Sequence, residues 1–307
     1  MLGLAEAVGR LTPIDMVQKR IGWKAYLDPL PPQVNPAPMW GRSSGSSDFA
    51  PPWPDLWIAA GRASLPLSVR VRKWSEGHTF VVQLQDPRAP LNLFDLVAPP
   101  LHDKLTGPNV FPIVGSPHRI TPAKLASAYE TFADRIDHLL RPRLTVLIGG
   151  KSKAFDLPPA RAEMLADDLA RALDHSAASL LMTFSRRTPE AAERILRERL
   201  RGYPGIIWDG AGENPYFAFL AAADFIVVTQ DSVNMVAEAA STGKPVYIAA
   251  VDGDQWRKRL FHADLAERGV ARLFEGVLEP FTYEPLRETD RLAAEVLRLL
   301  WMRRTGA

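Results

Sequence analysis

The 307-residue sequence predicts an α/β protein of two domains, the C-terminal one built on a doubly wound parallel sheet. Its C-terminal half alternates short apolar runs of strand length with stretches whose apolar residues recur at helical spacing. Continuous apolar runs are typical of strands buried on both faces, and their alternation with helices indicates βαβ units in a parallel sheet. The N-terminal half shows the same alternation in shorter and weaker segments. A chain of this length accommodates two domains of about 150 residues each.

The C-terminal domain is expected over residues 142–288. Its predicted strands are the apolar runs 144–148, 179–184, 206–208, 225–229 and 246–250. Helices between them are indicated by apolar residues at i, i+4 and i+8, as at Leu165, Leu169 and Leu173. A helix over 233–242 is expected to end at Gly243, because glycine commonly terminates helices.

The N-terminal domain is expected over residues 1–141, with strands at 56–60, 79–84, 93–98 and 110–114. Thr121 and Pro122 are typical of a helix start, and Pro142 marks the domain boundary after that helix. Because the chain opens with the helical pattern MLGLAEAVGR, we expect this domain to lack its first strand, through an upstream start or through loss. Residues 28–54 are rich in Pro, Gly and Ser and predict a mobile surface loop.

Composition excludes several classes of function. The chain has no Cys, which excludes disulfides, thiolate metal sites and a cysteine nucleophile. A net charge of +2 is too small to indicate a nucleic-acid partner. The six histidines show no metal-ligand spacing, so we expect neither a metal nor a cofactor. Without a signal-peptide pattern or an apolar run of roughly 18–20 residues, we expect a cytoplasmic protein.

Candidate ligand-binding residues of the C-terminal domain follow its strands, at the edge where open α/β sheets bind ligands. Glycines let backbone N–H groups approach a phosphate, and cationic or hydroxyl side chains add charge and hydrogen bonds. Spacing alone leaves three alternatives open: a simple tight turn at 149–150, a contact from Arg187 in place of its neighbour, and a capping role at 214. The candidates are Gly149, Gly150, Lys151, Ser185, Arg186, Asn214, Asp231 and Ser232.

One polar stripe adds a ninth candidate. Asp231, Asn234 and Glu238 recur at i, i+3 and i+7 along the predicted helix. A carboxylate at Glu238 can accept hydrogen bonds from both hydroxyls of a ribose, while the helix start with Ser232 faces a phosphate. The stripe begins at the carboxyl edge of a strand, which favours a nucleotide site over a solvated helix face.

The N-terminal domain offers residues for the opposite side of a cleft. Its strand ends carry Gly61, Arg62, Gln85 and Arg88, and Arg119 follows the run 110–114. Facing the other domain, these residues would form an acceptor side. His118 is the only histidine at such a position and is therefore the candidate proton acceptor, with a capping or surface role as the alternative.

Several segments together resemble the mitochondrial fission, or "elongated mitochondria", family, and the chain resembles a bacterial member. They are LGLAEAVG at 2–9, DLWIAAGR at 55–62, VVQLQDPR at 81–88, VLIGGKSKAF at 146–155 and the DSVNM core at 231–235. The stretch 225–249 resembles the donor segment of GT-B glycosyltransferases. The resemblance implies a GT-B-like fold of two Rossmann-like domains facing across a cleft, and a nucleoside-diphosphate sugar as ligand. Glu238 matches the ribose-binding glutamate, whereas Asp231 and Ser232 stand where common GT-B enzymes have glycines.

Three functions follow from the resemblance and the residues. The first is a glycosyltransferase acting on an unknown acceptor, with Arg186 or Lys151 stabilising the leaving diphosphate. The second is a nucleotide-sugar epimerase, and the third is a non-catalytic interaction protein. A C-terminal helix over 289–307 is basic on one side, and its apolar side is expected to dock on a domain or to lie on an anionic membrane surface.

Overall fold

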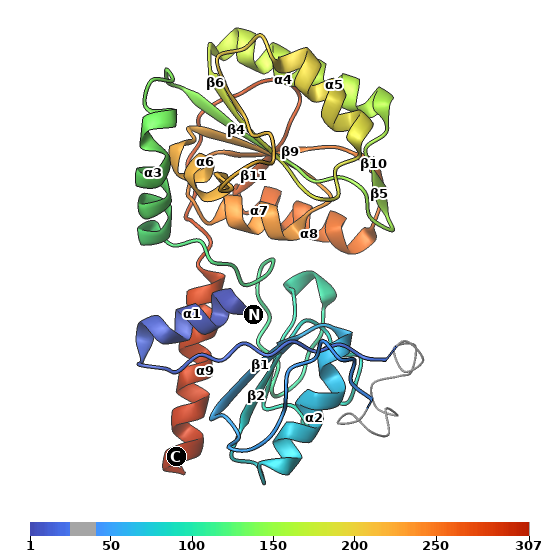
Figure 1. Ribbon diagram of the computed structural model, residues 1–307, viewed down its shortest axis with the longest axis vertical. Helices are drawn as coiled ribbons and strands as arrows, with labels where there is room; N and C mark the ends of the chain where they lie inside the picture. The colour runs from blue at the N-terminus through green and yellow to red at the C-terminus, as the bar shows by residue number, and fades with distance from the viewer. Residues whose placement is uncertain (25–40, 307) are drawn as a thin grey trace. The chain divides into compact units, whose positions relative to one another are not determined.

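The computed structural model describes residues 1–24 and 41–306 (Figure 1). It divides into two compact units: unit 1 comprises Met1–His118 with Glu288–Ala307, and unit 2 comprises Arg119–Arg287. The division differs from the predicted boundary after residue 141. Part of the predicted mobile loop 28–54, residues 28–40, lies outside the described residues. Its remainder is hydrogen-bonded to residues 20–24, for example from Gly22 N–H to Ser46 Oγ at 2.8 Å.

Unit 2 contains a six-stranded sheet with every neighbouring pair parallel. Its order is β11-β9-β8-β4-β6-β7. Thus the chain builds one side of β4 first, with β6 and β7, and then crosses to the other side with β8, β9 and β11. The strands are β4 (Arg143–Ile148), β6 (Ser179–Phe184), β7 (Gly205–Ile207), β8 (Phe225–Thr229), β9 (Val246–Ala249) and β11 (Ala271–Leu273).

The helices of unit 2 cover both faces of this sheet, which confirms the predicted fold class. Figure 1 shows α4 and α5 on one face and α7 and α8 on the other. A short antiparallel pair, β5 (Phe155–Asp156) with β10 (Asp252–Gly253), lies beside them. The helices are α3 (Pro122–Ile136), α4 (Pro159–Ser176), α5 (Glu190–Leu200), α6 (Tyr216–Ala222), α7 (Val233–Ala240) and α8 (Trp256–Glu267).

Helix α3 explains why the boundary lies earlier than predicted. It begins as expected, with the Thr121 side chain accepting a hydrogen bond from Lys124 N–H at 3.1 Å. Its apolar face, including Phe132 and Ile136, packs with Phe219 of α6 in one buried cluster. The helix therefore belongs to unit 2 and does not close the N-terminal domain.

Unit 1 contains a parallel sheet of β1 (Leu56–Ala60), β2 (Phe80–Leu84) and β3 (Leu96–Ala98), in that order. Helix α2 (Leu65–Trp74) connects β1 to β2. The prediction of a full strand at 110–114 was wrong. These residues form isolated bridges instead, Val110 with Val97 and Ile113 with Pro100. Short 3-10 helices lie at Arg62–Ser64, Leu91–Leu93 and Leu101–Asp103.

The first and last helices pack together in unit 1. Leu4 of α1 (Leu2–Leu11) shares a buried cluster with Leu292 and Val296 of α9 (Glu288–Thr305) and with strand β2. This confirms that the apolar side of the C-terminal helix docks on a domain. Its basic side chains form ion pairs within unit 1: Arg298 with Glu295, Arg303 with Asp95 and Arg304 with Asp55. None of the helices in the described ranges meets the length and hydropathy needed to cross a membrane.

Candidate functional site

The strand order of unit 2 indicates where a ligand binds. In an open α/β sheet, the crevice lies at the carboxyl edge where the strand order reverses, because the loops from the two central strands diverge there. In unit 2 the reversal falls between β4 and β8. Gly149 follows β4, and Gln230 and Asp231 follow β8.

Asp231 lies at the centre of this edge. Its side chain is 0% exposed and forms an ion pair with Arg187 at 2.8 Å. Thr229 Oγ1 donates to its Oδ1 at 2.7 Å and accepts a hydrogen bond from Gly149 N–H at 2.7 Å. A Cβ on Gly149 would lie 2.2 Å from the same carboxylate oxygen. Only glycine therefore allows the turn after β4 to approach Asp231.

The turn after β6 joins this network. Ser185 Oγ donates to the Gly149 carbonyl at 3.1 Å, and Thr188 Oγ1 donates to it at 2.5 Å. Gly150 has a φ of +143°, and a Cβ there would lie 2.6 Å from the Arg187 carbonyl oxygen. The structure thus brings together Gly149, Gly150, Ser185 and Asp231, as the strand ends predict.

The cation that contacts the Asp231 carboxylate is neither of the two predicted ones, Arg186 and Lys151. Arg186 is exposed, and the Lys151 ammonium pairs with Asp156, at 4.0 Å, with 72% of its own side chain exposed. Of the two adjacent arginines, Arg187 is the one that supplies the guanidinium at the strand reversal.

Helix α8 supplies two further side chains, which are not among the candidates predicted from the sequence. Lys258 Nζ donates to the Asp231 carbonyl and lies 4.6 Å from the centre of the Phe155 ring. Burial lowers the pKa of Lys258. His262, one turn further along, has Nε2 at 2.9 Å from the Gln230 carbonyl oxygen. The i, i+4 spacing of these residues was the available signal. The Gln230 C=O and the Asp231 N–H belong to the same trans peptide and point in opposite directions. Because the Gln230 carbonyl faces His262, the Asp231 N–H points away from α8.

Glu238 of α7 faces Tyr216, the first residue of α6. The Tyr216 hydroxyl donates to Glu238 Oε2 at 2.6 Å, and both side chains are partly buried. Burial raises the pKa of the Glu238 carboxyl, and the hydrogen bond from Tyr216 opposes that rise. Burial and the neighbouring carboxylate hold the pKa of Tyr216 well above its usual value.

The remaining unit 2 candidates have local structural partners. Ser232 is the N-cap of α7, and its side chain accepts from Met235 N–H. Asn214 Oδ1 accepts from Tyr216 N–H at 3.0 Å, which matches the capping alternative.

The unit 1 candidates lie at the carboxyl ends of β1 and β2, which are parallel neighbours. Gly61 and Gln85, the residues directly after these strands, have φ values of +79° and +71°. Arg88, at +50°, has its N–H bonded to the Asp86 carboxylate at 2.8 Å. Arg62 is exposed. These residues therefore share one edge of the unit 1 sheet.

His118 and Arg119 lie on opposite sides of the division between the units. His118 is 8% exposed, and its backbone N–H donates to Thr289 Oγ1 of α9 at 3.0 Å. Burial lowers the pKa of its ring to about 4, against an opposing effect of Asp290. Burial and the backbone contact with α9 are consistent with a structural role in unit 1, and the proton transfer stays a prediction.

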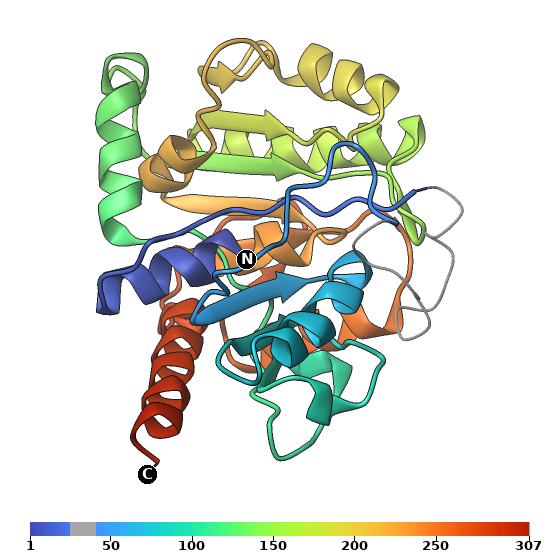
Figure 2. The same ribbon diagram turned by 60° about the horizontal axis from the view of Figure 1, so that its bottom comes forward.

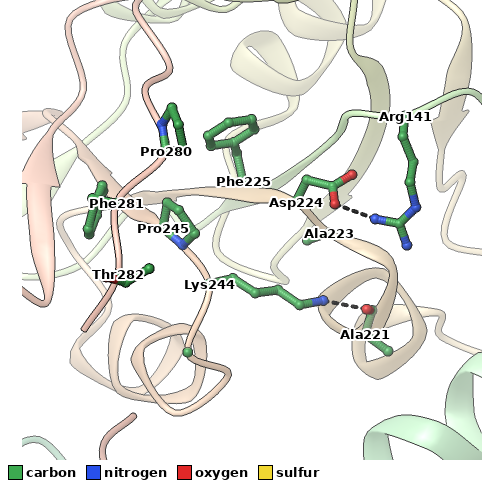
Figure 3. Close-up of a pocket in the computed structure, with 11 residues that line it drawn as sticks. Arg141, Ala221, Ala223, Asp224, Phe225, Lys244, Pro245, Pro280, Phe281 and Thr282 are labelled. Atoms are coloured by element: carbon green, nitrogen blue, oxygen red, sulfur yellow. Dashed lines mark hydrogen bonds and ion pairs between the residues drawn. The ribbon is translucent and has the colours of Figure 1, made fainter. Parts of the chain in front are cut away.

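A separate cavity of about 490 Å³ lies at the opposite, amino edge of the unit 2 sheet, where β8 and β9 begin (Figure 3). Its two cations have internal partners. Arg141 pairs with Asp224, and Lys244 Nζ donates to carbonyls at the end of α6, those of Leu220 and Ala221. Burial lowers the pKa of Lys244 to about 8. Within residues 1–24 and 41–306, no cluster of three or more His, Asp or Glu side chains suits a metal ion.

Comparison with known proteins agrees with the resemblance seen in the sequence. A family model described as "Mitochondrial fission ELM1" matches residues 1–300. The Arabidopsis thaliana protein "Mitochondrial fission protein ELM1" is 34% identical over 274 residues, covering 80% of this chain and 64% of its own length. The Rickettsia prowazekii protein RP120 is 29% identical over 280 residues, covering 78% of each chain.

Among solved structures, the UDP-GlcNAc 2-epimerase of Methanocaldococcus jannaschii is similar with a TM-score of 0.52. The match covers 80% of this chain and 77% of that one, at 13% sequence identity. At this identity the likeness shows the fold alone, which is GT-B-like and built from two Rossmann-like units.

Proposed function

Since the chain belongs to the mitochondrial fission ELM1 family, we propose that it binds a nucleoside-diphosphate sugar through unit 2 and transfers the sugar to an acceptor. One observation carries the proposal. Where the strand order reverses, a guanidinium, an ammonium and a helix bearing a carboxylate meet beside two close-packed glycines. This set matches the chemistry of a nucleoside diphosphate, which presents two phosphates and a ribose diol.

The ribose would bind at Glu238. An ionised carboxylate is a pure acceptor with room for several hydrogen bonds, so it can accept both hydroxyls of a ribose. The diphosphate would then lie toward the start of α7, where Ser232 and the positive end of the helix dipole favour an anion.

Arg187 and Lys258 would bind the diphosphate. The Arg187 side chain is 41% exposed, so its guanidinium can turn from Asp231 toward a ligand while remaining at the same edge. Cations fixed at this position stabilise the charge that develops on a leaving diphosphate, which is the main requirement of glycosyl transfer. In this assignment Arg187 takes the role that the sequence suggested for Arg186 or Lys151.

The acceptor would bind at unit 1, at the strand ends that carry Gly61, Arg62, Gln85 and Arg88. The chain spans 64% of the length of its Arabidopsis relative. The acceptor is therefore proposed here and is not taken from that relative.

Isothermal titration of the full chain with UDP, GDP, dTDP and their sugars tests the proposal. We expect one nucleotide series to bind, and Arg187→Gln to weaken its binding roughly 10- to 100-fold, the range for a hydrogen bond to a charged group. Arg186→Gln is the matched control, since it removes an equal charge from the adjacent position, whereas the ion pair with Asp231 is made by Arg187. Absence of binding across the panel would overturn the proposal.

Product analysis with the nucleotide sugar that binds separates the reaction classes. Release of free nucleotide together with a glycosylated acceptor supports transfer. A change of sugar configuration on the intact nucleotide would indicate an epimerase. Tight binding without turnover would indicate an interaction protein that keeps its ligand.

A further inference from the structure

The contact between α6 and α7 places a phenol against the carboxylate assigned to the ribose. We propose that Tyr216 is a positioning residue that holds Glu238 for the two adjacent hydroxyls of a ribose, so that the site selects ribonucleoside over 2′-deoxyribonucleoside diphosphates. This inference rests on the proposed nucleotide site and names the sugar of the nucleotide that it takes.

The geometry fixes both partners. Tyr216 is held at the start of α6, where its N–H donates to Asn214 Oδ1 at 3.0 Å. Its ring packs edge-on against that of Phe217, with the ring centres 5.6 Å apart. Its hydroxyl donates to Glu238 Oε2 at 2.6 Å, a short bond to a charged acceptor. Within the described residues, Tyr216 is the only side chain with a hydrogen bond to this carboxylate in the structure.

The number of hydrogen bonds that the Glu238 carboxylate can accept accounts for the selectivity for ribose over 2′-deoxyribose. An ionised carboxylate has about four lone-pair sites, of which Tyr216 uses one on Oε2. A ribose can donate from both its 2′- and 3′-hydroxyls to the sites that remain. A 2′-deoxyribose donates only once and leaves a partly buried, charged acceptor short of a partner. Losing a hydrogen bond to such a group reduces affinity roughly 10- to 100-fold.

The same phenol keeps Glu238 in the form that accepts. Burial alone raises the pKa of Glu238, and a protonated carboxyl would have fewer lone pairs for the diol. The Tyr216 hydrogen bond stabilises the ionised form and lowers that pKa. Without the hydroxyl, we expect Glu238 to protonate at a higher pH and its carboxylate to lose its fixed orientation.

Titration of the full chain with UDP and 2′-deoxy-UDP, and with GDP and 2′-deoxy-GDP, tests this role. We expect the wild-type protein to prefer the ribonucleotide of the binding pair roughly 10- to 100-fold. Tyr216→Phe should reduce that ratio to within a few-fold of one. It should also move the acid limb of nucleotide binding to higher pH. Because the ligand ionises identically in both titrations, a difference between the curves belongs to the protein.

Tyr203→Phe is the matched control, because it removes a phenol that donates to the carboxylate of Asp174 at 2.9 Å on another part of unit 2. We expect it to leave both the ratio and the pH profile unchanged. Glu238→Gln is a second variant and should lose the ribose preference as Tyr216→Phe does.

The outcomes separate the inference from the function beneath it. Nucleotide binding with an unchanged ratio and an unshifted pH profile in Tyr216→Phe would overturn the role of Tyr216 and leave the nucleotide site standing. Equal wild-type affinity for the ribo and deoxy forms would overturn the ribose selectivity. Failure of the wild-type chain to bind either pair would overturn the proposed function itself.

Discussion

Gly149 and the Asp231 carboxylate approach each other closely at the carboxyl edge of unit 2, and the candidate site depends on this close approach. The Asp231 carboxylate is held from two sides, by Arg187 and by the Thr229 hydroxyl. A side chain on Gly149 would displace it, because a Cβ would lie within 2.2 Å of Oδ1. The conformation of the turn after β4 therefore depends on the absence of a side chain at Gly149.

Gly149→Ala should destabilise the protein by about 1–3 kcal/mol, the usual cost of overpacking a buried position. Asp231→Ala removes the obstacle, so the double variant should recover at least about 1 kcal/mol relative to the sum of the single changes. Urea unfolding of the four proteins measures this coupling. Strict additivity would contradict the close approach of the two residues.

His118 should make stability depend on pH in acid. Its ordinary pKa of 6.5 falls to about 4 in the folded chain. Above 6.5 the ring is neutral in both states and has no effect. As the pH falls from 6.5 toward 4, the unfolded chain takes up a proton that the folded chain does not, so stability is lost. The loss approaches about 3 kcal/mol.

His118→Gln should remove that part of the acid destabilisation, measured by urea unfolding at pH 7.5 and at pH 4.5. A variant that loses as much stability as the wild type between these two pH values would contradict the burial of a neutral ring. A catalytic role would instead appear as lost turnover with unchanged pH dependence of stability.

The positions of several candidate residues follow from strand ends and helix spacing in the sequence. Gly149, Ser185 and Asp231 lie together because the carboxyl ends of parallel neighbours meet at one edge. Although the i, i+4 spacing of Lys258 and His262 places those two on one helix face, spacing alone does not give the contacts of Tyr216, Arg187 and Lys258. Their contacts depend on how a turn directs a side chain and on how α6 and α8 pack, and neither is encoded in local spacing.

At the scale of elements, α3 shows the same limit. Its start and its apolar face could be read from Thr121, Pro122 and the helical spacing. Its partner could not, because an amphipathic helix packs equally well on any complementary apolar surface. In the structure that surface is α6, so a helix predicted to close the first domain belongs to unit 2.

Thr121→Ala should destabilise unit 2 by about 1 kcal/mol, because it removes the side chain that caps α3 at Lys124 N–H. Thr131→Ala is the control, since Thr131 lies within the same helix, where its hydroxyl bonds only to a carbonyl of its own helix. Amide hydrogen exchange should show faster exchange in α3 and in its partner α6. Faster exchange confined to unit 1 would contradict the assignment of α3.

At the scale of the whole molecule, the alternation of strands and helices predicts an α/β protein of two domains with parallel sheets, and the structure confirms this fold class, with a doubly wound sheet in unit 2 and a three-stranded parallel sheet in unit 1. The strand order could not be read from the sequence, because strands of similar composition can pair in several orders. That order locates the nucleotide site: it reverses between β4 and β8, whose turns carry Gly149 and Asp231.

The central claim is that this reversal binds a nucleotide through Glu238, and thermal unfolding of the full chain with UDP, GDP and dTDP tests it most directly. A ligand at 100 times its Kd stabilises by about 2.7 kcal/mol, which raises Tm by about 5–10 °C for a unit of this size. We predict such a rise for at least one nucleotide in the wild-type chain and little or none in Glu238→Gln, whose unliganded Tm should remain close to the wild-type value. No rise with any nucleotide, or an equal rise in the variant, would contradict the account.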